Sequence, residues 1–283
     1  MRIVSDSTAD LPLSIIDEYN VEIIPLRVHF GEEVYLDWVD MKPEKFYHKL
    51  TSTDILPRTS QPSPADFVKK YKEIGEGETI ISIHISSNLS GTYQSAMMAR
   101  DMLPEMDIHV FDTKLASMAH GAVVMEAARA AREAKSREEV LHLVKEMIDK
   151  VRVYFMVNTF EYLQKNGRIG RAQAMLGSLL KVKPILTLED GIVTPKEKAR
   201  GRAKALDRLV KICQDEFGSK NPVKIALLHG NVLEEVLKLK EMVEGVFNFE
   251  EAVISDLGAV IGSHTGPGVV GIVIYPHNDY LIS

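Results

Sequence analysis

Four short segments of this sequence are rich in hydroxyl-bearing side chains, and each lies where an expected strand ends. They are residues 5–10 (SDSTAD), 58–64 (RTSQPSP), 86–92 (SSNLSGT) and 261–268 (IGSHTGPG). Open α/β sheets bind their ligands beyond the carboxyl ends of the strands. Hydroxyl groups and a histidine supply hydrogen bonds without a metal ion or a P-loop lysine. Each segment alone is also typical of helix caps and turns, but together they favour a shared site for an oxygen-rich group.

Several catalytic signatures are missing from the sequence. No HExxH, GxxxxGK[ST] or GxSxG pattern occurs, so zincin, P-loop and hydrolase-elbow sites lack their usual marks. Residues 266–271 (GPGVVG) match GxGxxG, but they precede an expected strand instead of a helix, and we reject a dinucleotide site. The single cysteine, Cys213, excludes an intramolecular disulfide and a cysteine metal cluster. We expect a buried helical thiol there, and we expect neither a metal nor a cofactor.

The elements that must position these groups alternate through the first half of the chain. Expected strands cover residues 2–4, 21–30, 79–85 and 108–111, and expected helices cover 13–19, 43–50, 64–72, 91–103 and 116–134. Ser136 and Glu139 fit a capping box that opens a further helix to about Lys150. Such alternation predicts a mainly parallel sheet with flanking helices, as an α/β N-terminal domain over residues 1–151.

The second half predicts a different arrangement, an α+β C-terminal domain over residues 152–283. Asp190 and Gly191 suit a tight turn between strands at 183–188 and 192–196. A helix at 202–217, a strand at 223–228, a helix at 233–243 and strands near 250–255 and 269–275 complete it. We therefore expect a two-domain protein.

Composition excludes some classes of function. The net charge of −6 and a pI near 5.9 argue against a dedicated nucleic-acid binder. No run of about 18 apolar residues could span a membrane. The N-terminus lacks the apolar region of a signal peptide, which predicts a cytoplasmic protein.

Five motifs, in order along the chain, resemble those of the DegV family of bacterial fatty-acid-binding proteins. They are residues 6–12 (DSTADLP), 59–63 (TSQPS), 86–96 (SSNLSGTYQSA), 166–168 (NGR) and 262–268 (GSHTGPG). The resemblance implies that a long-chain fatty acid such as palmitate, stearate or oleate lies buried between the two domains. It further implies that the chain performs no catalysis itself and presents the carboxylate to a fatty acid kinase, which forms an acyl phosphate.

The resemblance also implies where the carboxylate binds. The family's contacts correspond to Thr59 and Ser87, with His264 and Thr265 close by. Hydroxyl donors satisfy a carboxylate without adding a permanent charge, and the start of a helix favours an anion. The predicted carboxylate site comprises Thr59, Ser60, Ser87, Gly91, His264 and Thr265. Candidate contacts for the tail, which plain core packing explains equally well, are Ile24, Leu26, Phe30, Leu163, Met175, Leu176, Leu179 and Ile185.

Two basic segments, residues 166–171 (NGRIGR) and 196–204 (KEKARGRAK), stand out in this acidic chain. They predict a docking face for an acidic partner or a phosphate-bearing substrate, although a solvated helix start explains the second one as well. The candidate docking residues are Arg168, Arg171, Arg200 and Arg202.

Two other functions stay open at this level. The chain could be an enzyme, either a Ser/His hydrolase or a phosphotransferase subunit of the dihydroxyacetone-kinase type, whose fold the DegV family is similar to. Ser87 or His264 would then need a third group, for which Asp6 and Asp112 are the candidates. It could also be an interaction protein without a ligand, in which the hydroxyl clusters are plain caps.

Overall fold

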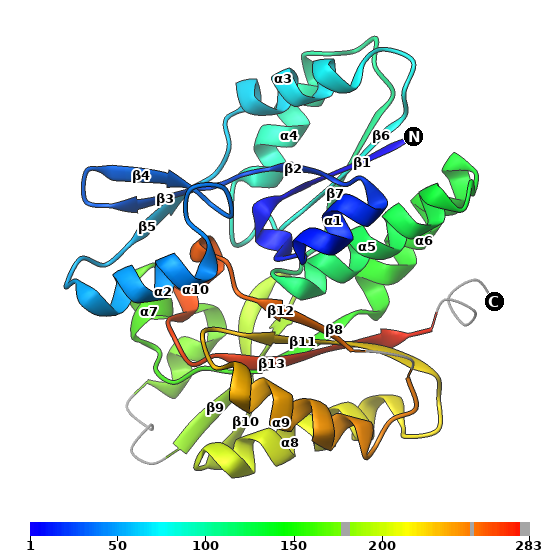
Figure 1. Ribbon diagram of the computed structural model, residues 1–283. Helices are drawn as coiled ribbons and strands as arrows, with labels where there is room; N and C mark the ends of the chain where they lie inside the picture. Colours follow the sequence, from blue (N-terminus) through cyan, green and yellow to red (C-terminus); the bar gives the residue numbers. More distant parts are fainter. Residues whose placement is uncertain (177–181, 250–251, 278–283) are drawn as a thin grey trace.

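The computed structural model describes residues 1–176, 182–249 and 252–277, and this part of the chain forms three β-sheets with helices between and around them (Figure 1). None of the helices in the described ranges is long and apolar enough to cross a membrane.

The first sheet is parallel throughout, with strand order β2-β1-β6-β7, and it confirms the prediction for the first half of the chain. Successive side chains point to opposite faces, so that Ile3 and Ile81 pack toward one group of helices and Val4 and Ile80 toward the other. The strands are β1 (Arg2–Asp6), β2 (Glu22–Ile24), β6 (Ile80–His84) and β7 (Ile108–Asp112). The helices beside them are α1 (Leu13–Tyr19), α3 (Pro64–Ile74), α4 (Thr92–Asp101), α5 (Met118–Arg132) and α6 (Arg137–Lys150).

The second sheet has six strands in the order β10-β9-β8-β13-β11-β12, of which only β11 and β12 pair in parallel. Its strands are β8 (Arg152–Met156), β9 (Val182–Glu189), β10 (Ile192–Arg200), β11 (Val223–His229), β12 (Val253–Asp256) and β13 (Val270–Pro276). Helices α8 (Arg202–Phe217) and α9 (Leu233–Glu244) cover one face. The predicted domain boundary falls at Val151, between α6 and β8, and it stays a prediction.

Helix α5 lies between the two large sheets and joins them into one stack. Twelve of its 15 residues are buried, and it contacts β1 and β6 on one side and β11 and β13 on the other. A Cβ at Gly121 would come within 2.4 Å of the Ala9 carbonyl oxygen, so this glycine lets α5 approach the segment that follows β1. Figure 1 shows the stack from α3 and α4 at the top to α8 and α9 at the bottom.

The third sheet is small and antiparallel, in the order β4-β3-β5. It corrects the prediction of one strand over residues 21–30. Pro25 has no backbone N–H and interrupts that segment, so β2 joins the parallel sheet while the chain beyond Pro25 enters the small one. The elements here are β3 (Arg27–Phe30), β4 (Glu33–Leu36), β5 (Arg58–Ser60), α2 (Pro43–Ser52) and α10 (Ala259–Thr265).

Helix α10 was not predicted, and it links the end of the chain to its beginning. Ala259 and Val260 share a core with Leu26, which precedes β3, and with Phe46 and Tyr47 of α2. Helix α10 thus contacts β3, β5 and α2 of the first third of the chain, and it also contacts α7 (Glu161–Lys165).

The structure confirms three local predictions: a capping box, a tight turn and a buried helical cysteine. Ser136 Oγ accepts a hydrogen bond from the Glu139 N–H at 3.3 Å, and the Ser136 N–H donates to Glu139 Oε2 at 2.7 Å. Asp190 and Gly191, with φ values of 53° and 75°, form the turn between β9 and β10. Cys213 is buried on α8. Short helical segments complete the described chain at η1 (Ser7–Ala9), α7 (Glu161–Lys165) and η2 (Gly170–Met175).

Candidate ligand-binding site

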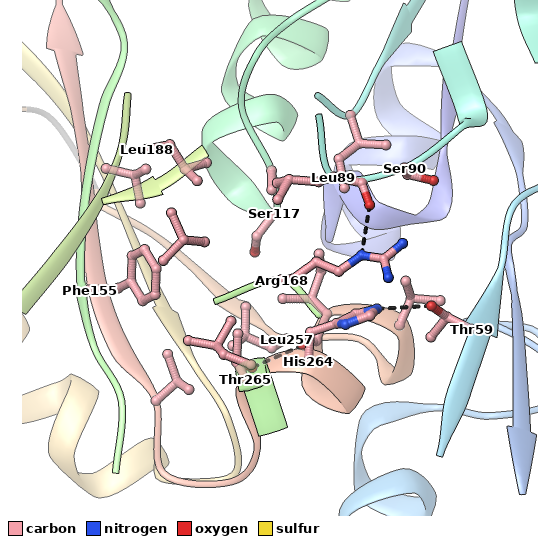
Figure 2. A pocket seen from close by; sticks show the side chains of 18 of the residues that line it. Thr59, Leu89, Ser90, Ser117, Phe155, Arg168, Leu188, Leu257, His264 and Thr265 are labelled. Carbon is pink, nitrogen blue, oxygen red and sulfur yellow. Dashed lines mark hydrogen bonds between the residues drawn. The ribbon is translucent and has the colours of Figure 1, made fainter. Parts of the chain in front are cut away.

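A pocket lies between the two large sheets, beyond the carboxyl ends of β6 and β7, with β5 and α10 beside it (Figure 2). The empty volume of the pocket, including the part open to solvent, is about 880 Å³. The part of this volume that the centre of a water molecule can reach is about 100 Å³. One group of lining residues is polar: Thr59, Gln61, Ser90, Ser117, Arg168, His264 and Thr265. The others are apolar: Leu26, Ile85, Leu89, Ala116, Val153, Phe155, Leu163, Leu188, Val193, Leu228, Leu257, Val260, Ile261 and Val269.

Thr59 and His264 face each other at one end of this pocket, as Figure 2 shows. Thr59 Oγ1 and His264 Nε2 are 2.9 Å apart, and His264 Nδ1 is buried without a hydrogen-bond partner in the described structure. Burial, and secondly the charge of Arg168, lower the pKa of His264 to about 4. The neutral ring and the hydroxyl then carry two protons, and their mutual hydrogen bond uses one of them. The pair therefore has one proton left to donate to an oxygen of a ligand.

The NGR motif, residues 166–168, holds the walls of the polar end together. Asn166 Nδ2 donates to the Ser263 carbonyl of α10 at 2.8 Å. Arg168 Nε donates to the Leu89 carbonyl at 3.1 Å, and its Nη1 donates to the Asn166 carbonyl at 2.9 Å. The guanidinium reaches toward the loop of Leu89 and Ser90 in Figure 2. Arg168 therefore brings a positive charge to the mouth of the pocket. The sequence had instead predicted a role for Arg168 in docking a partner on an outer surface.

The apolar part of the pocket is formed by the six-stranded sheet and by the helices facing it. Val153 and Phe155 of β8 contribute to it, as do Leu188 of β9 and Leu228 of β11. Of the tail contacts predicted from the sequence, Leu26 and Leu163 line the pocket. Leu179 lies outside the described residues. The remaining candidates do not line this pocket in the described structure: Ile24, Phe30, Met175, Leu176 and Ile185.

Three of the predicted carboxylate contacts lie outside the pocket lining. Ser87 Oγ donates to Asp112 Oδ2 at 2.5 Å, and the Ser87 N–H donates to Asp112 Oδ1 at 3.0 Å, so this hydroxyl is directed away from a ligand. Ser60 Oγ lies 2.9 Å from His29 Nε2. At Gly91, a Cβ would come within 2.5 Å of Gln61 Nε2, so this glycine makes room for a side chain of the protein.

Thr59, His264 and Thr265 all line the pocket, but the hydroxyl of Thr265 already has a partner. Its Oγ1 donates to the Ile261 carbonyl one turn earlier in α10, at 3.0 Å, which uses its only proton. Ser90 lines the pocket instead of Ser87. Its segment had been singled out as rich in hydroxyls, but the sequence carries no signal for which serine turns inward. Gln61 and Ser117 were likewise missed.

Two of the glycines after residue 260 make room for side chains of the protein. A Cβ at Gly262 would come within 2.5 Å of Phe46 Cε1, and one at Gly266 within 2.3 Å of Tyr162 Cδ2. These glycines let α10 pack closely against α2 and α7.

The other predicted docking arginines do not form one cluster. Arg202 is partly buried and bonded within the protein, since it pairs with Glu235, donates to Asn158 Oδ1 at 2.6 Å and donates to the Gly268 carbonyl at 2.7 Å. Arg200 is exposed at one end of the β9–β10 hairpin. Arg171 is exposed near its other end, where Asp190 lies 3.2 Å away. About eight residues of strand, or roughly 26 Å, separate the two ends.

Of the proposed catalytic groups, the structure pairs Ser87 with Asp112, whereas His264 bonds Thr59. Asp6 bonds His84 of the parallel sheet with an Oδ2–Nδ1 distance of 2.9 Å. His84 Nε2 lies 2.7 Å from Ser82 Oγ, which completes a Ser–His–Asp chain. All three side chains are fully buried, and they lie outside the pocket lining. Burial alone would raise the pKa of Asp6, but His120 and His84 lower it to about 2. This chain of hydrogen bonds joins β1 and β6 within the parallel sheet.

No group of three or more His, Cys, Asp or Glu side chains suited to a metal ion occurs within residues 1–176, 182–249 and 252–277.

Comparison with known proteins gives close matches over nearly the whole chain. A sequence model of the DegV family, described as a family of uncharacterised proteins, matches residues 1–277. The protein DegV of Bacillus subtilis is 38% identical over 274 residues, which cover 96% of this chain and 98% of the relative. A solved DegV family protein from Thermus thermophilus, described by its fatty acid binding, matches with a TM-score of 0.90 at 37% identity, covering 98% of this chain and 100% of the other. The structure of Bacillus subtilis DegV, described as a fatty acid binding protein, matches with a TM-score of 0.89 at 36% identity, covering 98% and 99%.

Proposed function

The chain belongs to the DegV family, and on that premise we propose that it binds one long-chain fatty acid in the pocket, with the carboxylate at the Thr59–His264 pair. The observation that carries the proposal is that the pocket has a mainly apolar lining and a polar end with a proton to donate. Solved relatives described as fatty acid binding proteins support the same ligand class.

The apolar chain supplies most of the affinity in this proposal. Burying about 14 methylenes at ~0.8 kcal/mol each contributes roughly 11 kcal/mol before the costs of association. A charge-assisted hydrogen bond contributes about 1.5–3 kcal/mol. The polar end therefore adds a smaller share and decides which end of the fatty acid faces the mouth.

Three polar groups then contact the carboxylate. The Thr59–His264 pair donates one hydrogen bond, and Arg168 supplies a positive charge at the mouth. Ser90 Oγ lies 2.8 Å from Thr92 Oγ1, and when Thr92 is the donor of that bond, Ser90 donates a second hydrogen bond to the carboxylate. A neutral His264 avoids placing a second cation beside Arg168.

The test is denaturing organic extraction of the purified protein, followed by mass spectrometry and by titration with oleate. We expect about one fatty acid per chain. Ala116, which lines the pocket, gives a blocking variant, Ala116→Phe, and exposed Ala203 on α8 gives a matched control, Ala203→Phe. Loss of lipid in the first variant alone supports the pocket. A wild-type protein that is empty and does not take up oleate overturns the proposal.

We further propose that the chain acts as a carrier without catalysis of its own and presents the carboxylate to a fatty acid kinase, which forms the acyl phosphate. An exposed basic side chain such as Arg200, together with the charge of Arg168 at the mouth, supports contact with an acidic partner or with phosphate. A cytoplasmic location, where ATP is present, belongs to the same proposal. The test is ATP consumption by such a kinase with the loaded protein and with the protein stripped of lipid. Equal consumption in both would exclude presentation.

A further inference from the structure

Asp10 connects three separate segments of the chain beneath the pocket. Its Oδ1 accepts hydrogen bonds from the Gly258 N–H at 2.9 Å and from Trp38 Nε1 at 3.2 Å. Its Oδ2 accepts from Ser117 Oγ at 2.7 Å. Asp10, Trp38 and Ser117 all have positive φ values, of 49°, 64° and 53°. Such backbone strain in residues other than glycine persists only where the surroundings hold it, so this junction is firmly built.

Asp37 holds the start of α10 in a second way. Its Oδ1 accepts hydrogen bonds from the Ala259 N–H at 2.9 Å and from the Val260 N–H at 3.3 Å. These are the first two residues of the helix, whose N–H groups have no partner within the helix. Together with Asp10 and Gly258, three consecutive backbone N–H groups at the start of α10 depend on two carboxyl groups from the first 40 residues.

The two carboxyl groups are buried and close enough to repel each other. Burial, and secondly the charge of Asp37, raise the pKa of Asp10 well above its ordinary value. Burial raises the pKa of Asp37 to about 7, and ionised Asp6 of β1 contributes. Tyr47 of α2 faces both groups, and Asp256 at the end of β12 acts on Tyr47. None of these neighbours is a cation, and burial favours the protonated form of Asp37 below about pH 7.

Helix α10 also forms part of the wall of the pocket. Val260, Ile261, His264 and Thr265 of this helix all line it. A ligand enclosed there gains a way out when α10 lifts from the first half of the chain. Lifting would expose Asp37 to water, where a carboxyl group loses its proton near pH 4.

We propose that Asp10 and Asp37 are positioning residues that hold α10, and with it His264, over the pocket, and that the proton of buried Asp37 links release of the bound fatty acid to pH. This inference rests on the proposed function. Because opening lets Asp37 lose its proton, a rise in pH favours the open form. The effect ends once Asp37 is ionised in the closed form as well, at about pH 7. One proton changes the opening equilibrium by at most about tenfold per pH unit.

The experiment measures the rate at which a fluorescent long-chain fatty acid leaves the full chain for excess acceptor vesicles, between pH 5.5 and 8. Stoichiometric loading at pH 6 is established first, because failure to load would contradict the proposed function itself and not the role of the carboxyl pair. For the wild type we expect the release rate to rise by up to about tenfold per pH unit up to pH 7 and then to level off.

Asp37→Asn mimics the protonated side chain, and we expect slow release with little dependence on pH. The titrations of His264 and of the ligand affect both proteins alike, so the difference between the two profiles belongs to Asp37. The same profile in both proteins overturns the proposal. If Asp37→Asn does not fold, as judged by circular dichroism, the wild type is measured with a fluorescent long-chain alcohol, which does not titrate. A flat profile with the alcohol overturns the proposal as well.

Asp10 is tested by a pair of variants that both tolerate its left-handed backbone. Asp10→Asn keeps a side chain that can bond Gly258, Trp38 and Ser117, and we expect release within about threefold of the wild type. Asp10→Gly removes these bonds without straining the backbone, and we expect release at least about tenfold faster at pH 6. Release from Asp10→Gly as slow as from the wild type would show that Asp10 does not position α10.

Discussion

Replacing Thr59 by Val removes one hydroxyl group from the polar end of the pocket and keeps the shape of the side chain. Thr59 lies in strand β5, where a β-branched residue is well tolerated. The change leaves His264 Nε2 without its partner at 2.9 Å, in addition to Nδ1, which already lacks one in the described structure. If the Thr59–His264 pair donates the proton that binds the carboxylate, the variant loses or misplaces one charge-assisted hydrogen bond.

Such a bond contributes about 1.5–3 kcal/mol, which corresponds to a dissociation constant for oleate about 10–150-fold higher. Isothermal titration of lipid-free protein with oleate measures it directly. Thr265→Val is the matched control in the same pocket, because Thr265 already donates its proton to the Ile261 carbonyl. We expect this control to change the dissociation constant by less than about threefold. Thr and Val differ in helix propensity by only a few tenths of a kcal/mol, so the substitution should disturb α10 little.

Two results would refute the reasoning. A dissociation constant for Thr59→Val within about threefold of the wild type would show that the pair does not hold the carboxylate. An equal loss in both variants would show that any polar change in the pocket weakens binding, without a special role for the pair. Titration with the corresponding long-chain alcohol separates these cases, because the alcohol lacks the charge and should distinguish the wild type from Thr59→Val much less.

Further predictions concern other parts of the site. Ser90→Ala should weaken oleate binding by about tenfold. Ser87→Ala should change it by less than about twofold, because Ser87 bonds Asp112. If titration with oleate shows the larger loss for Ser87→Ala, Ser87 and not Ser90 binds the carboxylate. The pKa of His264 is lowered from 6.5 to about 4 in the folded protein, so folding favours the neutral ring. As the pH falls from 6.5 to 4, the unfolded chain gains a proton at this residue before the folded protein does. The free energy of unfolding of the lipid-free protein should therefore fall by about 3 kcal/mol over this range because of His264. Urea unfolding of the wild type and of His264→Gln gives this contribution as a difference, which should shrink with bound fatty acid, because a carboxylate raises the pKa of His264; identical pH profiles would exclude it. Arg200→Glu should lower the rate at which a fatty acid kinase uses the loaded protein by at least about tenfold without changing oleate affinity, whereas Arg171→Glu, whose charge Asp190 already balances, should lower it less. Equal kinase rates for both variants and the wild type would show that these arginines do not form a docking face.

Local patterns were sufficient to predict much of the fold. Alternating apolar runs identified the parallel sheet, because buried strands and amphipathic helices each impose their own period. Ser136 and the Asp190–Gly191 turn were readable because a cap or turn involves only neighbouring residues. The strand over residues 21–30 was wrong because its two parts, separated by Pro25, pair with different partners far away in the sequence.

The sequence by itself determined the family, the alternation of strands and helices, and the segments that carry the polar groups of the site. It could not determine which side chain of each segment faces the pocket. Ser87 turns away because Asp112, 25 residues later, accepts its proton, and Ser90 lines the pocket in its place. Helix α10 likewise depends on Asp37, which is 222 residues away in the sequence and satisfies its first N–H group. Only the tertiary structure decided these points, because a hydroxyl or an N–H group takes its direction from partners that folding brings together.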